Sequence, residues 1–211
     1  MPRLPRPVFA LVFLAAVVVS APAHATLDAG TLLVAPTVNA GSADFVSASG
    51  GYLSAYDHGE VGFGGEAWYF LDDATAVAVA GTVGRFKETN TNAAGVDRWY
   101  TQHSFSARAG VDRVLQYRQD ALFYFGPGVE FWRGHSTFEG FDPIAVTTPD
   151  VTRLSVSARF GGMMVIGDRW GLVGHLGWRA GYAKAEDAGM KTTWFPNGFE
   201  GGAGFVVALG R

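Results

Sequence analysis

The feature that most constrains the fold is a strict alternation of apolar residues with small or charged ones. Successive side chains of a β-strand point to opposite faces, so a period of two predicts a strand with one apolar face. In 121–134 the apolar face carries Phe123, Phe125, Val129 and Phe131, and the other face carries Tyr124, Gly126, Gly128 and Glu130. We predict eight such strands, at about 29–39, 58–71, 75–87, 99–113, 121–134, 152–166, 171–184 and 197–210.

The connections between these strands alternate in length. Three are short: 72–74, 114–120 and 167–170. The other four are long and rich in Ser, Thr, Asn, Asp and Gly: 40–57, 88–98, 135–151 and 185–196. Short turns at one end and long loops at the other are typical of an up-and-down barrel in an outer membrane, with both termini on the periplasmic side.

The polar face of the strands is crowded with glycine, of which the chain has 29. Such a face suits a narrow tube, because the interior of an eight-stranded barrel is just wide enough for side chains to fill it. We therefore assign the polar face to the lumen and the apolar face to lipid. The predicted fold class is all-β: an eight-stranded antiparallel up-and-down transmembrane β-barrel.

The first 25 residues have the layout of a secretory signal peptide. Arg3 and Arg6 precede the unbroken apolar stretch 8–19, and the small-x-small sequence 23–25 follows. A membrane anchor helix is the alternative, but the stretch is too short to span a bilayer. We predict that 1–25 is removed near Ala25, that 26–211 forms the barrel, and that the location is the outer membrane of a Gram-negative-type bacterium.

Charged residues on the lumen face form the candidate site. Burying charges in a narrow lumen is costly unless they are paired, so we predict a lumen charge network. Its predicted members are Glu66, Arg108, Glu130, Arg159, Arg179 and Glu200. The same alternation turns Glu60 and Arg153 inward and places His175 in the network. Arg85 is assigned inward with less support, because it shares a face with Val77, Val79 and Val83.

Aromatic residues cluster near the strand ends and predict girdles at the two membrane interfaces. The predicted girdle residues are Tyr69, Trp99, Tyr100, Trp132, Trp170, Tyr182, Trp194 and Phe195. The alternative is that they are ordinary core aromatics.

The signal peptide, the eight alternating segments and Gly-rich strands such as 124–130 give the chain a resemblance to the small outer-membrane β-barrel proteins of the OmpA transmembrane-domain, OmpX and OmpW type. The resemblance implies insertion by the barrel-assembly machinery and contact with outer-membrane lipids and lipopolysaccharide. The long loops carry apolar residues such as Phe45, Tyr52 and Phe138 among polar ones, which predicts an extracellular partner reached through the loops. The alternative is that these residues pack on each other or on lipid headgroups. The formal net charge of −3 argues against a nucleic-acid partner. No cofactor motif and no metal-ligand spacing is found, and without cysteine a thiolate site is impossible.

We expect a non-enzymatic, structural or surface-interaction role in the cell envelope. One alternative is a porin-like narrow pore or conduit for small molecules. A second is a lipid A-modifying enzyme of the PagL type, which pairs a histidine with a serine. Here the alternation places His103 opposite Ser104 and Ser106, and His135 opposite Ser136, whereas a serine nucleophile needs its base within hydrogen-bond reach. A third alternative is a soluble secreted β-sandwich.

Overall fold

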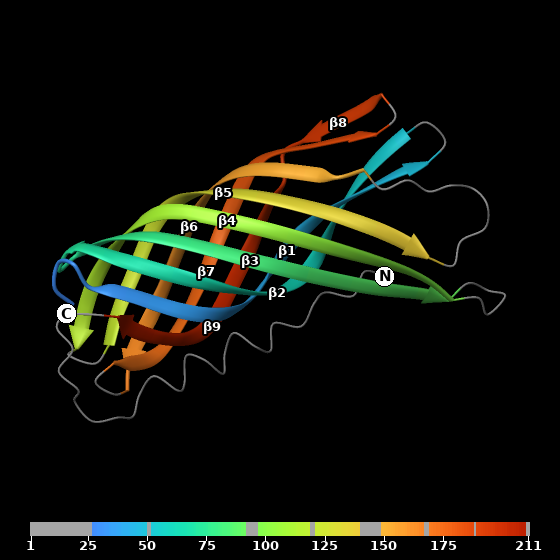
Figure 1. Ribbon diagram of the computed structural model, residues 1–211. Coiled ribbons are helices and arrows are strands. Elements are labelled where there is room, and N and C mark those ends of the chain that lie inside the picture. The colour runs from blue at the N-terminus through green and yellow to red at the C-terminus, as the bar shows by residue number, and fades with distance from the viewer. Residues whose placement is uncertain are drawn as a thin grey trace.

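The computed structural model describes residues 27–49, 52–91, 97–118, 121–139, 149–166, 169–187 and 189–209 (Figure 1). The predicted signal peptide lies outside these ranges. In this part of the chain no helix is long and apolar enough to span a bilayer. The strands are β1 (Leu32–Ser49), β2 (Tyr52–Asp72), β3 (Thr75–Thr91), β4 (Asp97–Arg118), β5 (Ala121–Glu139), β6 (Val151–Val165), β7 (Trp170–Asp187), β8 (Met190–Trp194) and β9 (Asn197–Leu209).

The strands close into a barrel. Each strand from β1 to β6 pairs antiparallel with the next, and β9 pairs with both β7 and β1. Closure runs from the pair Leu32–Leu209 to the pair Gly41–Glu200. β8 pairs only with β7, as the outer part of the eighth strand. The predicted eight-stranded antiparallel barrel is therefore confirmed.

The eighth strand is interrupted at Pro196, between β8 and β9. Proline has no backbone N–H and cannot donate to a sheet. Its carbonyl still accepts a hydrogen bond from the backbone N–H of Gly181 on β7, at 3.0 Å. The interruption separates the closed barrel from a short extension that follows β7 outward.

Most of the predicted long loops are wrong, because much of their length is paired strand. β1 and β2 continue through the predicted loop 40–57 as far as the pair Ser49–Tyr52, and β8 lies within the predicted loop 185–196. The alternation ends where the lipid-facing band ends, because a sheet with two wet faces needs no apolar side. Backbone pairing continues beyond that point, so strands predicted from the alternation alone are too short.

Beyond the closed barrel the sheet divides into three blades. β1 loses its β9 partner after Gly41, and β2 has no β3 partner before Val61, which leaves a β1–β2 hairpin. β3, β4 and β5 form a second blade, because β5 has no β6 partner after Gly134. β7 and β8 form the third blade. All three project from the end opposite the short turns (Figure 1).

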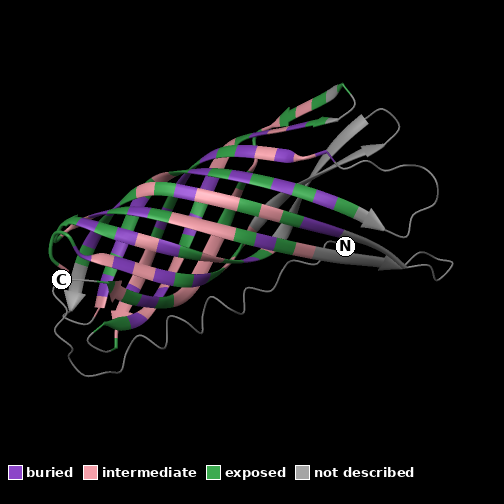
Figure 2. Ribbon diagram, viewed as in Figure 1, coloured by how far each residue is buried: buried purple, intermediate pink, exposed green. Residues whose placement is uncertain are grey.

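Buried and exposed residues alternate along the barrel strands wherever burial is described (Figure 2). In β6 the residues at 151, 153, 155, 157 and 159 are buried and those at 154, 156, 158 and 160 are exposed. The strand 75–87 follows the same rule, with Val77, Val79 and Val83 facing outward together with Arg85. The inward assignment of Arg85 is therefore wrong. Its side chain lies in the outward-facing row of β3, beyond the apolar residues that face lipid.

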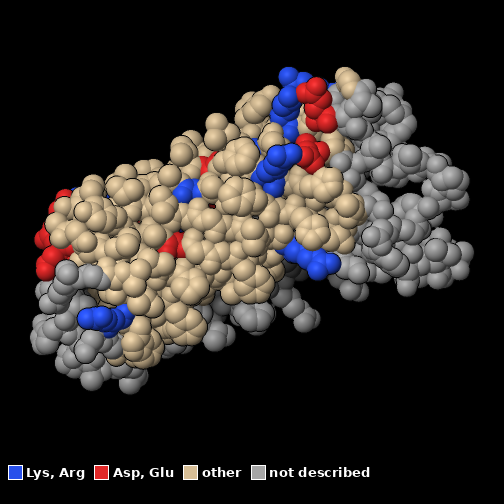
Figure 3. All heavy atoms as spheres, in the orientation of Figure 1, with Lys and Arg blue, Asp and Glu red and all other residues tan. Residues whose placement is uncertain are grey.

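The outer wall of the barrel is an apolar surface. Among the large apolar side chains that face outward are Phe63, Leu154, Phe160 and Phe205, each at least 60% exposed. A contiguous apolar surface of this extent requires a lipid or protein cover. On the face shown in Figure 3 the middle of the barrel is largely uncharged, and most charged side chains lie toward its ends. This distribution fits a bilayer, with the short turns on the periplasmic side.

The lipid-facing assignment predicts a specific cost for a charge on the wall. Val79 is 50% exposed on β3, and we expect Val79→Lys to destabilise the barrel by ~2–4 kcal/mol if Val79 lies near the bilayer midplane. Urea unfolding of the protein in lipid vesicles measures this cost, with Val79→Leu as the control. An unchanged urea midpoint for Val79→Lys would contradict the placement of Val79 in the hydrocarbon layer of the bilayer.

Candidate functional site

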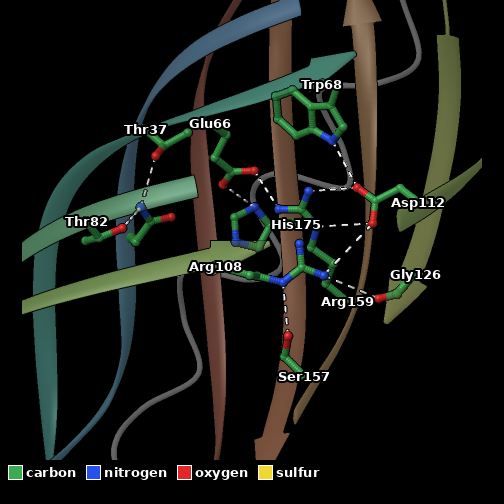
Figure 4. A network of polar contacts seen from close by, with 11 residues as sticks. Thr37, Glu66, Trp68, Thr82, Arg108, Asp112, Gly126, Ser157, Arg159 and His175 are labelled. Carbon is green, nitrogen blue, oxygen red and sulfur yellow. Dashed lines mark hydrogen bonds and ion pairs between the residues drawn. The ribbon is translucent and has the colours of Figure 1, made fainter. Parts of the chain in front are cut away.

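Arg159 is the centre of the ion network inside the barrel (Figure 4). Its side chain rises from β6 and donates to Glu66 on β2 and to Asp112 on β4, each at 2.7 Å. β2 and β6 lie on opposite walls of the eight-stranded ring, so the hydrogen bond to Glu66 spans the lumen, while the one to Asp112 joins two strands separated by β5. Arg159 is only 3% exposed, and pairing with two carboxylates offsets the cost of removing its charge from water.

Two aromatic rings hold the same guanidinium from the sides. The Cζ atom of Arg159 lies 5.4 Å from the ring centroids of both Trp68 and Tyr124, within cation–π range. The two rings pack edge to face at 5.7 Å, and the indole N–H of Trp68 donates to Asp112 at 3.0 Å. The network is thereby joined to an apolar cluster that fills the periplasmic end of the lumen: Leu33, Ala35, Trp68, Phe70, Ala76, Ala78, Val114, Leu122, Tyr124, Met163, Val173 and Val206.

Arg108 and His175 extend this lower part of the network. Arg108 donates to the hydroxyl of Ser157 at 3.0 Å and lies 4.0 Å from Asp112. Its guanidinium covers Gly128, where a Cβ atom would lie 2.8 Å from Cζ. His175 Nδ1 lies 3.2 Å from a carboxylate oxygen of Glu66. A glycine face therefore makes room for long charged side chains in a narrow lumen.

A second cluster lies toward the extracellular end. Glu130 on β5 accepts hydrogen bonds from Arg179 at 2.7 Å and from Arg153 at 3.2 Å. Arg179 also reaches Glu200 on β9 at 3.3 Å. Above it, Glu60 accepts hydrogen bonds from the hydroxyl of Ser104 and from the indole of Trp132.

The structure places all six predicted network residues inside the barrel, and each contacts a charged partner. Sequence reasoning missed Asp112 and Trp68, although both continue the inward alternation of their strands by one step beyond Gly110 and Glu66. The prediction that Trp132 belongs to a girdle is wrong, because its side chain is buried in the lumen and is only 2% exposed. The predicted girdle residues Tyr69, Trp170, Tyr182 and Phe195 do face outward. Trp194 is partly buried and packs against the cluster of Trp132, Val151 and Ala185, and the side chains of Trp99 and Tyr100 lie outside the described set.

Between the two ion clusters, the described side chains line a small cavity of about 70 Å³. A site needs roughly 10–15 Å³ of such space for each water, so the cavity can hold a few ordered waters. Below it lie the Arg159 network and the apolar cluster, and above it Trp132 packs with Val151 and Ala185. Among the described side chains, the lumen is therefore filled at the periplasmic end and narrowed by Trp132 on the other side of the cavity.

The serine and histidine candidates lie on opposite sides of the wall. His103 faces outward, whereas Ser104 bonds Glu60 in the lumen and Ser106 lines the cavity. His135 also faces outward and Ser136 is buried. These pairs do not meet as nucleophile and base. Across the described residues, no group of three or more His, Asp or Glu side chains is arranged to hold a metal ion.

At the extracellular rim, Asp150 joins two outward-facing side chains of β5. Its carboxylate accepts a hydrogen bond from Arg133 at 2.5 Å and lies 2.6 Å from Nδ1 of His135. The hydrogen bond from Arg133 holds the pKa of Asp150 below its ordinary value, and the contact with His135 acts in the same direction.

The comparisons with known proteins agree with this architecture. Neither a protein-family model nor a curated protein sequence matches the chain. Among solved structures, the outer membrane protein OprG from Pseudomonas aeruginosa matches with a TM-score of 0.61 and 10% identity, over 87% of this chain and 98% of OprG. The outer membrane protein AlkL matches with a TM-score of 0.48 and 12% identity, over 91% of this chain and 96% of AlkL. Ail of Yersinia pestis matches with a TM-score of 0.41 and 13% identity, over 82% and 97%.

The likeness to OprG and the closed register define the class. The chain is an eight-stranded β-barrel with the fold of the small outer-membrane barrel proteins.

The ion network predicts a strong dependence of stability on Arg159. Arg159→Ala leaves the carboxylates of Glu66 and Asp112 without their main partner in a buried site, so we expect a loss of ~3–5 kcal/mol. Urea unfolding in detergent micelles measures it. Arg169→Ala, in an exposed periplasmic turn, is the matched control and should change stability by less than ~0.5 kcal/mol. Equal effects of the two substitutions would contradict a buried ion network.

The rim cluster predicts a small, pH-dependent contribution. Because the folded-state pKa of Asp150 is lowered, its contribution is fully present above the ordinary aspartate pKa of about 3.9 and is lost as pH falls through the lower folded value. The side chain of Asp150 is 40% exposed, so we expect Asp150→Asn to cost under ~1 kcal/mol at pH 7. In urea titrations, the difference from wild type should disappear at the acid end. A difference that grows on acidification would overturn this assignment.

Proposed function

We propose that the chain is a closed outer-membrane barrel that acts at the cell surface through its three blades, and that its lumen does not conduct. The observation that carries the proposal is the division of the sheet beyond the barrel. In the β1–β2 hairpin, residues 42–49 and 52–59 pair only with each other. At ~3.3 Å per residue, eight residues of such a strand project by about 26 Å.

The strand edges of the blades offer backbone hydrogen-bonding groups to a partner. Each blade has backbone N–H and C=O groups along edges that pair with no other strand in the described part of the chain. An extended polypeptide can add to such an edge by main-chain hydrogen bonding, with side chains at alternate positions for specificity. A protein or peptide partner at the cell surface is therefore the interaction that the architecture favours.

The filled lumen supports the non-conducting part of the proposal. Ion pairs link β6 to β2 on the opposite wall and to β4, and together with the apolar cluster at the periplasmic end they take up space that a pore would need. The conduit alternative has one observation in its favour, the lumen cavity of about 70 Å³. It is bounded by paired charges that would have to separate before a solute passed.

The experiment separates surface function from transport. We would replace residues 43–58 by Asn-Gly, a sequence that closes two-residue hairpins, so that Ser42 and Gly59 flank the new turn. The trimmed barrel should still show the heat-dependent gel shift of a folded barrel, because the removed pairs lie outside the closed ring. Adherence of expressing cells to collagen- and fibronectin-coated surfaces should fall to the level of cells without the gene.

Planar-bilayer recordings complete the test on the same two proteins. We expect baseline current from both wild type and the trimmed variant. Full adherence by the trimmed variant would contradict the surface role of this blade. Discrete, reproducible channel openings from the wild type would contradict the closed lumen and favour a conduit.

A further inference from the structure

The outer wall of the barrel contains a groove that the proposed function does not use. It has a volume of about 620 Å³ and lies on β5, β6 and β7 beside the interruption at Pro196. Its walls are apolar and aromatic, and the main contributors are Val129, Leu154, Val156, Trp178, Tyr182 and Phe195. Tyr182 and Phe195, which both line the groove, meet edge to face at 5.7 Å.

The register explains why the wall is hollow here. Ala180 lies between Trp178 and Tyr182 on the outward face of β7, and its cross-strand neighbours are Val156 on β6 and Asn197 on β9. A methyl group thus lies where the positions two residues before and after it carry large rings. The eighth strand also changes from β9 to β8 at this height, which removes a continuous neighbour.

Two ion-paired cations, Arg133 and Lys184, lie at the extracellular end of the groove. Arg133, Thr152 and Lys184 form one cross-strand row on β5, β6 and β7. The next row toward the periplasm is Phe131, Leu154 and Tyr182, and Leu154 and Tyr182 line the groove. Rows on one face are about 6.6 Å apart, so the two cations lie just above the apolar cleft.

Both cations have donors to spare. The side chains of Arg133 and Lys184 are 59% and 40% exposed. Arg133 contacts Asp150, and Lys184 lies 2.7 Å from Glu186. One carboxylate does not use up the five N–H donors of arginine or the three of lysine. These ion pairs hold the two long side chains at the rim and leave donors facing outward.

We propose that this groove, with Arg133 and Lys184 at its head, binds a phosphorylated acyl lipid of the outer leaflet. An acyl chain would lie against Leu154, Val156 and Ala180, and a phosphate would accept hydrogen bonds from the two cations. The occupant is a lipid because the groove lies on the wall that faces lipid. It carries phosphate because the polar end of the groove offers two cations, and guanidinium geometry suits phosphate oxygens.

The test uses the full mature chain folded in detergent micelles, with lipid binding measured by native mass spectrometry. The probes are bis-phosphorylated lipid A, the same lipid without phosphate, and inorganic phosphate. The head variant is Arg133→Gln with Lys184→Gln, and the groove variant is Ala180→Trp, which fills the cleft. Their matched controls are Arg169→Gln in a periplasmic turn and Val61→Trp, an outward position on the far wall. The heat-dependent gel shift confirms that every variant is folded.

We expect the head and groove variants each to bind lipid A at least fivefold more weakly than wild type, and the two controls to stay within twofold. Removing phosphate from the lipid should weaken binding to wild type by a similar factor and should make no difference to the head variant. Equal binding by wild type and both variants would overturn the site. Equal binding of the phosphorylated and dephosphorylated lipids would overturn its head, and binding of inorganic phosphate as tight as that of lipid A would overturn the role of the groove.

Discussion

The contact on which the rest of this barrel depends is the one between Arg159 and its two carboxylates. Glu66, Asp112 and Arg159 come from β2, β4 and β6, so the guanidinium ties together walls that share no backbone hydrogen bonds. Charges inside a narrow barrel cannot turn away to water, so each must find a partner or impose a large desolvation cost. The aromatic rings of Trp68 and Tyr124 then fix the guanidinium from the sides and join it to the apolar cluster below.

Strand number, pairing order and the direction of most side chains could be predicted from the sequence, because lipid on one side and a filled lumen on the other impose a strict period of two. The lumen glycines and arginines follow from the same rule. The predictions failed where that rule stops. Arg85 lies on the lipid-facing row but at its polar boundary, and the blades continue as paired strands after both faces become wet. Which charged residues pair inside the lumen, such as Arg159 with Asp112, depends on how far each strand is shifted along its neighbours. The alternation within one strand does not reveal that shift.

The two ends of the barrel have different chemistry. At the periplasmic end the lumen is apolar, the turns are short, and Asp72 and Asp73 are exposed. At the extracellular end the outward faces of β3, β5 and β7 carry Arg85, Arg133 and Lys184, and the sheet opens into blades. The apolar wall between the two ends holds the molecule in the bilayer. The residues at each end can therefore suit the aqueous compartment that they face. The groove beside Pro196 lies at the boundary between the wall and the charged rim.

The pairing of β1 with β9 also bears on the chain's connectivity. Leu32 and Leu209 are direct cross-strand partners, so the two ends of the barrel wall lie side by side at the periplasmic rim. The ring of strands therefore has no intrinsic first member. A short linker could join these ends and a new start could be placed at the exposed turn Asp72–Asp73 without altering any ladder. Circular permutants of this barrel should keep the same ring and the same lumen, and their order of synthesis would differ from that of the natural chain.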